Sequence, residues 1–258
     1  MHIALTIAGS DSGGGAGIQA DLKTFHRFGV FGTSAITALT AQNTRGVDGW
    51  IAVDADFVRR QIDAVAIDLR PRAVKTGMLG TAAVVAAVAS AVRDHGLTPL
   101  VVDPVMVATS GDPLLDDAAV TSVRTVLVPL ADLLTPNLDE VAVLLGVRPR
   151  DESEMCEAAR RLVVDLGARA ALVKGGHLDG EQVLDVLYDG EIRVFRRSRI
   201  TTSGTHGTGC TLSAAITALL ALGHSRRAAV ATALAFVHRA IETAPGLGSG
   251  HGPLNHWA

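Results

Sequence analysis

Aromatic residues and an excess of basic charge are what this 258-residue sequence has least of. Phe, Trp and Tyr together make up 3% of the chain, and 23 Lys and Arg stand against 26 Asp and Glu for a net charge of −3. Single-stranded nucleic acid is usually bound by stacking on aromatic rings, and duplex DNA by clustered basic residues. We therefore expect no nucleic-acid partner.

Cysteine and long apolar runs are also scarce. The two cysteines, Cys156 and Cys210, lie far apart and match no zinc-binding or redox spacing, so we expect no disulfide and a cytoplasmic location. The longest uncharged stretch, 200–225, begins with a glycine-rich loop and then offers fewer than the roughly 20 apolar residues that span a bilayer. Residues 2–8 lack a basic leader and are better interpreted as a first strand. We expect no membrane partner.

The chain does have 48% hydrophobic residues and 27 glycines, in runs that alternate between strand-like and helix-like patterns. This alternation predicts one α/β domain over residues 1–258, with a mostly parallel central sheet and helices on both faces. The predicted strands are 2–8, 30–40, 73–76, 100–103, 133–135, 170–174, 183–188 and 192–196, and the clearest helices lie near 17–25, 58–69, 82–92, 155–166 and 226–244. Residues 46–52, and the paired runs near 183 and 196, are predicted to be antiparallel strands at a sheet edge.

The most informative segment is the polar, glycine-spaced loop 202–213, which leads into a long helix of small residues. Gly207 and Gly209 have no Cβ, so the backbone can turn its N–H groups toward one point while a ligand comes close. These N–H groups belong to the first turn of a helix, where they have no partner within it and the helix dipole adds positive charge. The loop predicts a phosphate site, although Thr205 or Thr208 could instead simply cap the helix.

A second glycine-rich loop, 9–17, follows the first predicted strand and opens a helix. Its spacing is not the G-x-G-x-x-G of dinucleotide-binding proteins, so an NAD-dependent Rossmann enzyme is the weaker interpretation. Asp21 falls at the edge of the buried face of that helix, where a carboxylate needs either an ion-pair partner or a ligand. Gln42 closes the next strand, and its carboxamide presents a donor beside an acceptor, the pattern needed to pair with an aminopyrimidine.

Charged side chains follow three further strands, at the edge where open α/β sheets bind ligands. Asp103 and Glu140 could together hold Mg²⁺, directly or through water, although Glu140 could equally be a first-turn helix acid. Lys174 is one of only three lysines and could meet phosphate oxygens. No glycine-lysine-serine or glycine-lysine-threonine sequence occurs, so phosphoryl transfer would need a fold other than the P-loop type.

Taken together, these blocks resemble the hydroxymethylpyrimidine/phosphomethylpyrimidine kinases of thiamine biosynthesis, which belong to the ribokinase-like superfamily. The resemblance extends from about Ile7 to the last helix and is carried by residues 9–11, 14–24, 41–47, 75–79, 110–115, 135–137, 174–177 and 206–210. It implies a three-layer ribokinase-like fold, a homodimer, and a requirement for ATP and Mg²⁺. The implied activity phosphorylates 4-amino-5-hydroxymethyl-2-methylpyrimidine and then converts the monophosphate to the diphosphate.

The resemblance also implies roles for individual residues. Gln42 would bind the pyrimidine, in a pocket that Gly9, Asp21, Met78 and Val105 would line. The nucleotide phosphates would be bound by Lys174, Asn137, Thr208 and Gly209. The amides of 207–210 would form an anion hole, and residues 107–115 would form a lid over the substrate. Pyridoxal kinase, or an enzyme that accepts both alcohols, is the alternative. A vitamin-binding protein without catalysis would have no use for Lys174 and the anion loop.

Three positions leave questions open. Cys210 stands where many sugar kinases have an aspartate as general base, and a helix N-terminus lowers the pKa of a thiol, so either the thiol or only its backbone amide would act. Ser12 replaces a common proline, which should loosen its loop. Thr40 replaces a commonly aliphatic residue. The last two departures could alter how strictly the pyrimidine is chosen.

Overall fold

The central element of the molecule is an eight-stranded sheet. We analysed a computed structural model that describes residues 1–106, 116–178 and 180–258. The strands of this sheet are β1 (Ile3–Ala8), β2 (Phe31–Ile36), β5 (Ala73–Thr76), β6 (Leu100–Val102), β7 (Leu133–Leu134), β8 (Ala171–Lys174), β9 (Gln182–Tyr188) and β10 (Ile192–Ser198). Their order is β10-β9-β8-β7-β6-β5-β1-β2. Neighbours from β2 to β8 run parallel, and β9 and β10 are antiparallel at one edge, so the predicted mostly parallel sheet is confirmed.

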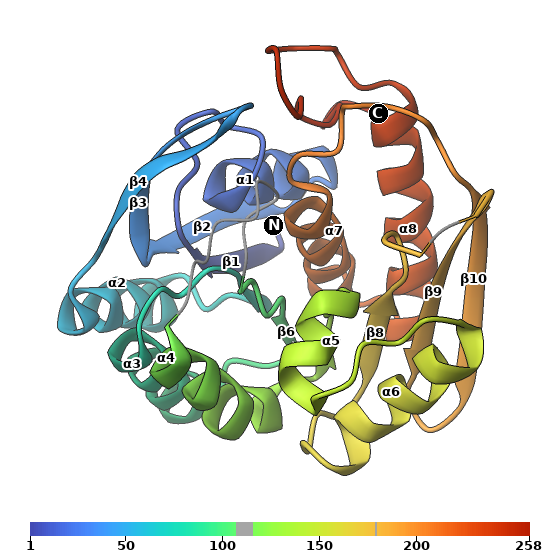
Figure 1. Cartoon of the computed structure of the whole chain (residues 1–258). Coiled ribbons are helices and arrows are strands. Elements are labelled where there is room, and N and C mark those ends of the chain that lie inside the picture. Colours follow the sequence, from blue (N-terminus) through green and yellow to red (C-terminus); the bar gives the residue numbers. More distant parts are fainter. Residues whose placement is uncertain (107–115, 179) are drawn as a thin grey trace.

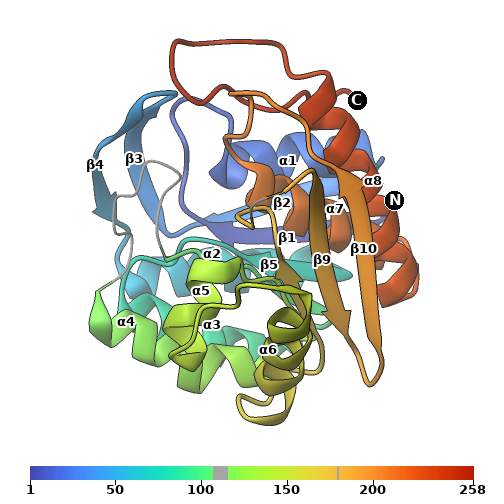
Figure 2. The ribbon, with the colours of Figure 1, turned by 45° about the vertical axis from the view of Figure 1, so that its right-hand side comes forward.

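Helices cover both faces of the sheet (Figures 1 and 2). One layer holds α1 (Gly17–Arg27), α7 (Thr208–Ala221) and α8 (Arg226–Glu242), and the other holds α2 (Ala55–Asp68), α3 (Ala82–His95), α4 (Asp117–Ser122), α5 (Leu138–Leu145) and α6 (Glu152–Val164). Side chains alternate along each strand, so Val101 and Leu172 pack with α7 and α8, whereas Val102 and Val173 pack with the opposite layer. The three-layer arrangement follows from strands that are apolar on both faces.

The predicted strand 30–40 is wrong as a single strand. It breaks at Thr37, whose N–H donates to Ala8 O (3.1 Å) and whose hydroxyl donates to Met78 O (2.6 Å). After this anchor β3 (Ala38–Asn43) leaves the main sheet and pairs antiparallel with β4 (Gly46–Ala52) in a sheet of two strands. Residues 46–52 are therefore an antiparallel strand, as predicted, but they do not lie at an edge of the main sheet.

The strand order places a crevice at the carboxyl end of β1. The chain passes from β1 to β2 on one side and later returns to β5 on the other, and open α/β sheets bind ligands where the order reverses in this way. The β3–β4 ribbon stands beside this end of the sheet (Figure 1). Within the described residues, no helix has the length and apolarity needed to cross a bilayer.

Candidate functional site

A cavity of about 700 Å³ lies at the carboxyl ends of the parallel strands. This volume is typical of small-molecule sites. All the site residues predicted from the sequence line it except Asp21, namely Gly9, Gln42, Met78, Asp103, Val105, Asn137, Glu140, Lys174, Gly207, Thr208, Gly209 and Cys210. The predicted lid, 107–115, lies outside the described residues. The fold thus brings together residues that lie far apart in the sequence, from Gly9 to Cys210.

The first turn of α7 opens into this cavity with unpaired amides. Gly207 is the N-cap residue with φ of 80°, and no side chain caps the helix, so the predicted alternative of a threonine cap is wrong. The N–H of Thr211 donates to Gly207 O (2.8 Å), but in the described part of the chain the N–H groups of Gly209 and Cys210 have no acceptor. Two unpaired donors at the positive end of a helix form a binding site for an anionic oxygen.

Two glycines at this helix start have distinct structural roles. A Cβ on Gly207 would lie 1.9 Å from Gly15 O, so the loop before α1 and the loop before α7 meet backbone to backbone. A Cβ on Gly209 would instead lie 3.3 Å from Lys174 Nζ. Gly207 therefore permits the close approach of two loops, and Gly209 leaves room for a cation beside the helix start.

Lys174 is held in place by two carboxylates. Its Nζ donates to Asp103 Oδ1 (2.9 Å) and lies 3.9 Å from Glu140 Oε2. Burial opposes its charged form, but Asp103 and Glu140 outweigh that effect and hold the pKa of Lys174 above its ordinary value. Burial likewise acts against the charge of Asp103, yet Lys174 and Lys75 keep the pKa of that carboxyl below its usual range. The site therefore contains a permanent cation against the unpaired amides of α7.

Glu140 has a structural role in addition to any catalytic one. Asn137 caps α5 by accepting the N–H groups of Asp139 (2.9 Å) and Glu140 (2.9 Å), and Glu140 Oε2 accepts the N–H of Asn137 (2.7 Å). This is the helix-acid alternative that the sequence left open. Burial raises the pKa of Glu140 to about 7, with Lys174 acting to lower it and Asp103 to raise it.

The donor set fits Mg²⁺ at Glu140 better than at Asp103. Asp103 Oδ1 accepts from Lys174 and Thr135 (3.2 Å), and its Oδ2 accepts from Ser213 (3.2 Å). Among the described residues, Glu140 Oε1 accepts no hydrogen bond, and no three His, Cys, Asp or Glu side chains converge to hold a metal. Since Mg²⁺ commonly takes one or two carboxylates and fills its other positions with water and phosphate oxygens, Glu140 is a suitable protein ligand.

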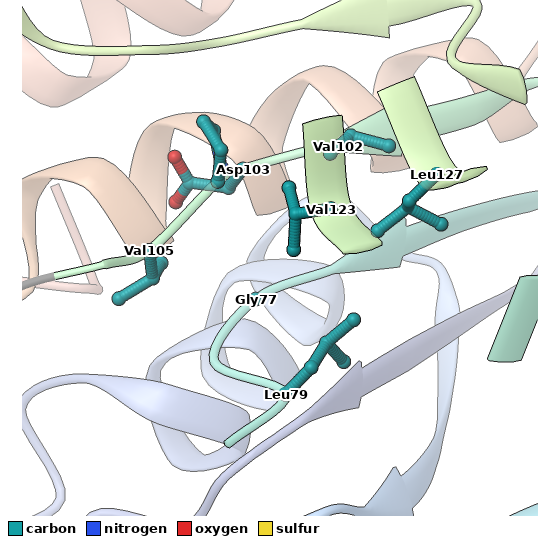
Figure 3. A pocket seen from close by; sticks show the side chains of 8 residues that line it. Gly77, Leu79, Val102, Asp103, Val105, Val123 and Leu127 are labelled. Carbon is teal, nitrogen blue, oxygen red and sulfur yellow. The ribbon is translucent and has the colours of Figure 1, made fainter. Parts of the chain in front are cut away.

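A second and much smaller cavity, of about 10 Å³, lies beside Asp103. Figure 3 shows the apolar side chains around it, with the Asp103 carboxylate pointing away from Val123 and Leu127. This volume accommodates about one water molecule, so it is not a ligand site. The two carboxylate oxygens of Asp103 accept hydrogen bonds, Oδ1 from Lys174 and Oδ2 from Ser213.

Asp21 does not line the pocket, contrary to the role implied by the family resemblance. Its side chain has no exposed surface and accepts from Lys75 Nζ (2.8 Å) and from the Thr6 hydroxyl (2.6 Å). The ion pair, the other possibility for a carboxylate on that helix face, is the one found. Sequence analysis assigned no role to Lys75, although a lysine within the buried strand β5 signals a buried partner, because an unpaired charge there is too costly.

The thiol of Cys210 is not activated, so the expectation of a lowered pKa is wrong. Burial raises the pKa of this thiol to about 11, although Lys75 acts in the opposite direction. The desolvation of a thiolate at this position outweighs the favourable field of the helix start. A thiol with this pKa is protonated near neutral pH, which favours the backbone N–H over the thiol as the group that would act.

Sequence analysis also missed a pair that joins the two glycine loops. His206 Nε2 lies 2.9 Å from Asp11 Oδ2, and the Asp11 carboxylate also accepts the N–H groups of Gly13 (2.8 Å), Gly15 (3.0 Å) and Ala16 (2.8 Å). Burial acts against the charge of Asp11, but His206 and the amides of Ala16 and Gly13 lower the pKa of its carboxyl. An aspartate two residues before a glycine run is a recognisable signal for such a turn.

The loop around Ser12 is tied down rather than loosened, which corrects the expectation from its missing proline. The Ser12 hydroxyl donates to Gln42 O (2.6 Å) and accepts the N–H of Gln42 (2.7 Å). The glycine loop after β1 and the end of β3 are therefore joined by one side chain.

The chain is similar to proteins of one family along nearly its whole length. A family model described as phosphomethylpyrimidine kinase matches residues 11–255. The chain belongs to the phosphomethylpyrimidine kinase family. Hydroxymethylpyrimidine/phosphomethylpyrimidine kinases from Rhizobium meliloti (strain 1021) and Bacillus subtilis (strain 168) are 52% and 48% identical to it. The matches cover 99% and 100% of this chain and 97% and 96% of those proteins.

Membership of the phosphomethylpyrimidine kinase family makes the chain an enzyme and a kinase. Among solved structures, the ADP complex of pyridoxal kinase from Bacillus subtilis has a TM-score of 0.92 at 38% identity, over 99% of this chain and 97% of that one. This likeness confirms the predicted three-layer ribokinase-like fold. The weaker interpretation as a Rossmann dehydrogenase is set aside.

Proposed function

We propose that this kinase uses ATP to phosphorylate 4-amino-5-hydroxymethyl-2-methylpyrimidine and then phosphorylates the monophosphate to the diphosphate, in thiamine biosynthesis. The observation that carries the proposal is the pair of N–H groups at Gly209 and Cys210, which have no acceptor among the described residues, beside the charged Lys174. These groups line the same cavity as Gln42, whose carboxamide suits an aminopyrimidine.

The phosphate end of the cavity supplies what phosphoryl transfer demands. The reaction needs alignment of donor and acceptor and neutralisation of charge on the transferred group, and little covalent chemistry from the protein. The two amides and Lys174 are fixed in advance and partly buried, so they stabilise developing negative charge more strongly than they would in water. Mg²⁺ bound at Glu140 would supply further neutralising charge to the phosphate oxygens.

No side chain needs to remove the alcohol proton before transfer begins. The thiol of Cys210 is protonated at neutral pH, and the transition state of phosphoryl transfer is loose, so a strong base gains little. Gln42 would place the pyrimidine so that its hydroxymethyl group points to the amides of α7. The rate would then come from position and charge.

The remaining wall of the cavity suits the base of a nucleotide. It includes apolar side chains from α5, α7, α8 and the β9–β10 region, namely Val143, Val183, Ile200, Leu212, Leu234, Val237 and Ile241. An aromatic base buries well against such side chains, while its phosphates reach toward Lys174.

A homodimer is part of the proposal. Leu39 and Ile51 form a directly opposed pair on β3 and β4, and their side chains are 45% and 65% exposed. An exposed apolar pair on a two-stranded ribbon is a suitable dimer contact. The cytoplasmic location stays a prediction.

The proposal is tested by measuring ADP release with the free pyrimidine, with its monophosphate and with pyridoxal, each with Mg²⁺ and with excess EDTA. We expect turnover of both pyrimidines that EDTA abolishes. Pyridoxal is included because a pyridoxal kinase shares this fold at 38% identity. A kcat/KM for pyridoxal above that for both pyrimidines would overturn the assignment in favour of the alternative.

A further inference from the structure

Two side chains, one from the glycine loop after β1 and one from β3, converge on one residue. Ser12 and Thr40 are far apart in the chain, yet both contact Gln42. Ser12 holds the backbone of Gln42 through its carbonyl and its N–H, at the point where the β3–β4 register shifts between Ala41 and Gln42. Because a bulge re-aims the side chain that follows it, this anchor sets where the Gln42 amide points.

Thr40 contacts the side chain of Gln42 and restricts its orientation. The Thr40 hydroxyl has one hydrogen, which it donates to Ser10 O at 2.9 Å. The Gln42 amide lies farther from the same hydroxyl, at 3.4 Å. Toward Gln42, Thr40 Oγ1 can therefore only accept, and the amide atom that faces it must be the NH₂ nitrogen.

His206 restricts the other polar atom of the Gln42 amide. The Asp11 carboxylate accepts three backbone N–H groups, so it is ionised and can only accept at its 2.9 Å contact with His206 Nε2. The hydrogen must then be on Nε2. This N–H already donates to Asp11, and the Gln42 amide lies farther from the same nitrogen, at 3.5 Å. A carbonyl oxygen on this side is attracted to the N–H, whereas an NH₂ group would set two donors against each other.

Both conditions are met by one orientation of the amide. The structure places Oε1 toward Thr40 and Nε2 toward His206, which leaves each contact without a matching donor and acceptor. The two amide atoms have nearly the same shape, and their identity is decided by the hydrogen-bond network. A half-turn of the amide gives Thr40 Oγ1 a donor to accept and removes the donor–donor contact with His206.

We propose that Thr40 and His206 lock the Gln42 amide with its NH₂ toward Thr40 and its carbonyl toward His206, while Ser12 fixes its backbone. Thr40 and Ser12 are then positioning residues that set substrate specificity. The proposal rests on the function proposed above, in which Gln42 binds the aminopyrimidine. A locked amide presents its donor and acceptor in a single order, whereas an amide free to flip presents either order.

The consequence is discrimination between two related ligands. An aminopyrimidine offers an amine donor beside a ring-nitrogen acceptor, and its 4-oxo analogue offers a carbonyl acceptor beside a ring N–H donor. A locked amide matches only one of these patterns, and the other leaves buried polar groups unpaired. We expect the unmodified enzyme to prefer the 4-amino compound over the 4-oxo compound by about a hundredfold in kcat/KM.

The test compares Thr40→Val with Thr40→Ser on both compounds. Valine keeps the shape of threonine but removes the acceptor, so the amide is released. We expect T40V to raise KM for the amino compound several-fold with kcat within about twofold, and to reduce the discrimination about tenfold. T40S keeps the hydroxyl and should retain both the KM and the discrimination of the unmodified enzyme. An unchanged ratio in T40V, or the same loss in T40S, would overturn the proposal.

Replacement of Ser12 provides an independent test, and measuring the binding of the two compounds separates this inference from the proposed function. We expect S12A to raise KM for the pyrimidine several-fold without changing KM for ATP, and an unchanged pyrimidine KM would contradict the anchoring role. Calorimetric titration of the two compounds without ATP should reproduce the discrimination. If the unmodified enzyme neither binds nor phosphorylates the amino compound, the proposed function fails. If it does both and T40V keeps full discrimination, only the locked amide fails.

Discussion

At the scale of single residues, burial and charge together decide the roles of Lys174 and Cys210. Both line the cavity beside the start of α7. Lys174 stays charged because Asp103 and Glu140 outweigh the cost of its burial, whereas Cys210 stays neutral because Lys75 only partly offsets that cost for a thiolate. The helix start therefore has a permanent cation and no thiolate base.

Replacement of Cys210 by alanine tests this difference. A thiol whose pKa is about 11 has about one molecule in ten thousand ionised at pH 7, so it is a poor base. We expect the kcat of C210A to stay within about threefold of the unmodified enzyme between pH 6 and pH 9. Cys156→Ala, which removes the other cysteine, is the control. A loss of more than about a hundredfold in C210A alone would return the thiol to the mechanism.

Glu140 should make stability depend on pH. Its pKa rises from 4.5 to about 7 in the folded protein, mainly through burial. The folded state therefore binds this proton more tightly than the unfolded state, so the contribution to stability is fully present below about pH 4.5 and is lost as pH rises through about 7. We expect the free energy of unfolding of the unmodified enzyme, relative to E140Q, to fall across that window in urea titrations.

The neighbouring acid of the same helix turn provides a control of opposite sign. The hydrogen bond from Arg148 lowers the pKa of Asp139 in the folded protein. The stability that Asp139 contributes is therefore present above the pKa of this carboxyl in the unfolded chain and is lost as pH falls. Asp139→Asn should therefore change stability at neutral pH more than in acid. A difference between E140Q and the unmodified enzyme that does not vary with pH would show that Glu140 titrates normally.

At the scale of elements, the start of α7 is the part of the fold on which the chemistry depends. Gly209→Ala adds a methyl group 3.3 Å from Lys174 Nζ, the end of a flexible side chain, so the protein should fold. The methyl group and the displaced lysine disturb the anion site, and we expect kcat to fall about a hundredfold with Tm little changed.

Gly207→Ala is the matched comparison. Its Cβ would lie 1.9 Å from Gly15 O, at a φ of 80° that alanine rarely adopts, so Tm should fall strongly. Thermal melts and initial rates of both variants separate a damaged site from a damaged fold. Full activity in G209A would contradict the assignment of the anion site to this helix turn.

The elements also show what could be predicted from sequence. Strand ends and glycine-spaced helix starts are local patterns, so Lys174, Glu140 and the loop at 207–210 could be placed at one edge of the sheet. The break at Thr37 was missed because it depends on carbonyl groups of Ala8 and Met78, which only the fold brings near. An apolar run looks the same whether it forms one strand or two.

Asp21 and Cys210 show a second limit. Both lie on helices, as predicted, but their chemistry depends on how much water reaches them and which charges lie nearby. Lys75 turns Asp21 into a buried ion-pair partner, and burial keeps the Cys210 thiol protonated. Neither effect is visible in sequence spacing.

At the scale of the whole molecule, we propose that residues 1–258 act as a single kinase domain, because the eight-stranded sheet includes both the first strand, β1, and the last strand, β10. The β3–β4 ribbon lies outside this sheet, and its exposed Leu39–Ile51 pair is the proposed dimer contact. We expect the unmodified enzyme to sediment as a dimer and Ile51→Lys to shift it toward monomer.

Ile67→Lys is the matched control for that experiment. Ile67 lies on α2 and is as exposed as Ile51, at 66% against 65%. The two variants add the same charge to surfaces of similar apolar exposure. If I51K sediments as the same dimer as I67K and the unmodified enzyme, the ribbon is not the interface.

The most direct test of the account is a crystal structure with a non-hydrolysable ATP analogue and the pyrimidine alcohol. The account predicts that the terminal phosphate accepts hydrogen bonds from the N–H groups of Gly209 and Cys210 and lies against Lys174 Nζ, with the alcohol oxygen in line. A terminal phosphate bound elsewhere in the cavity, with these amides still unpaired, would contradict it.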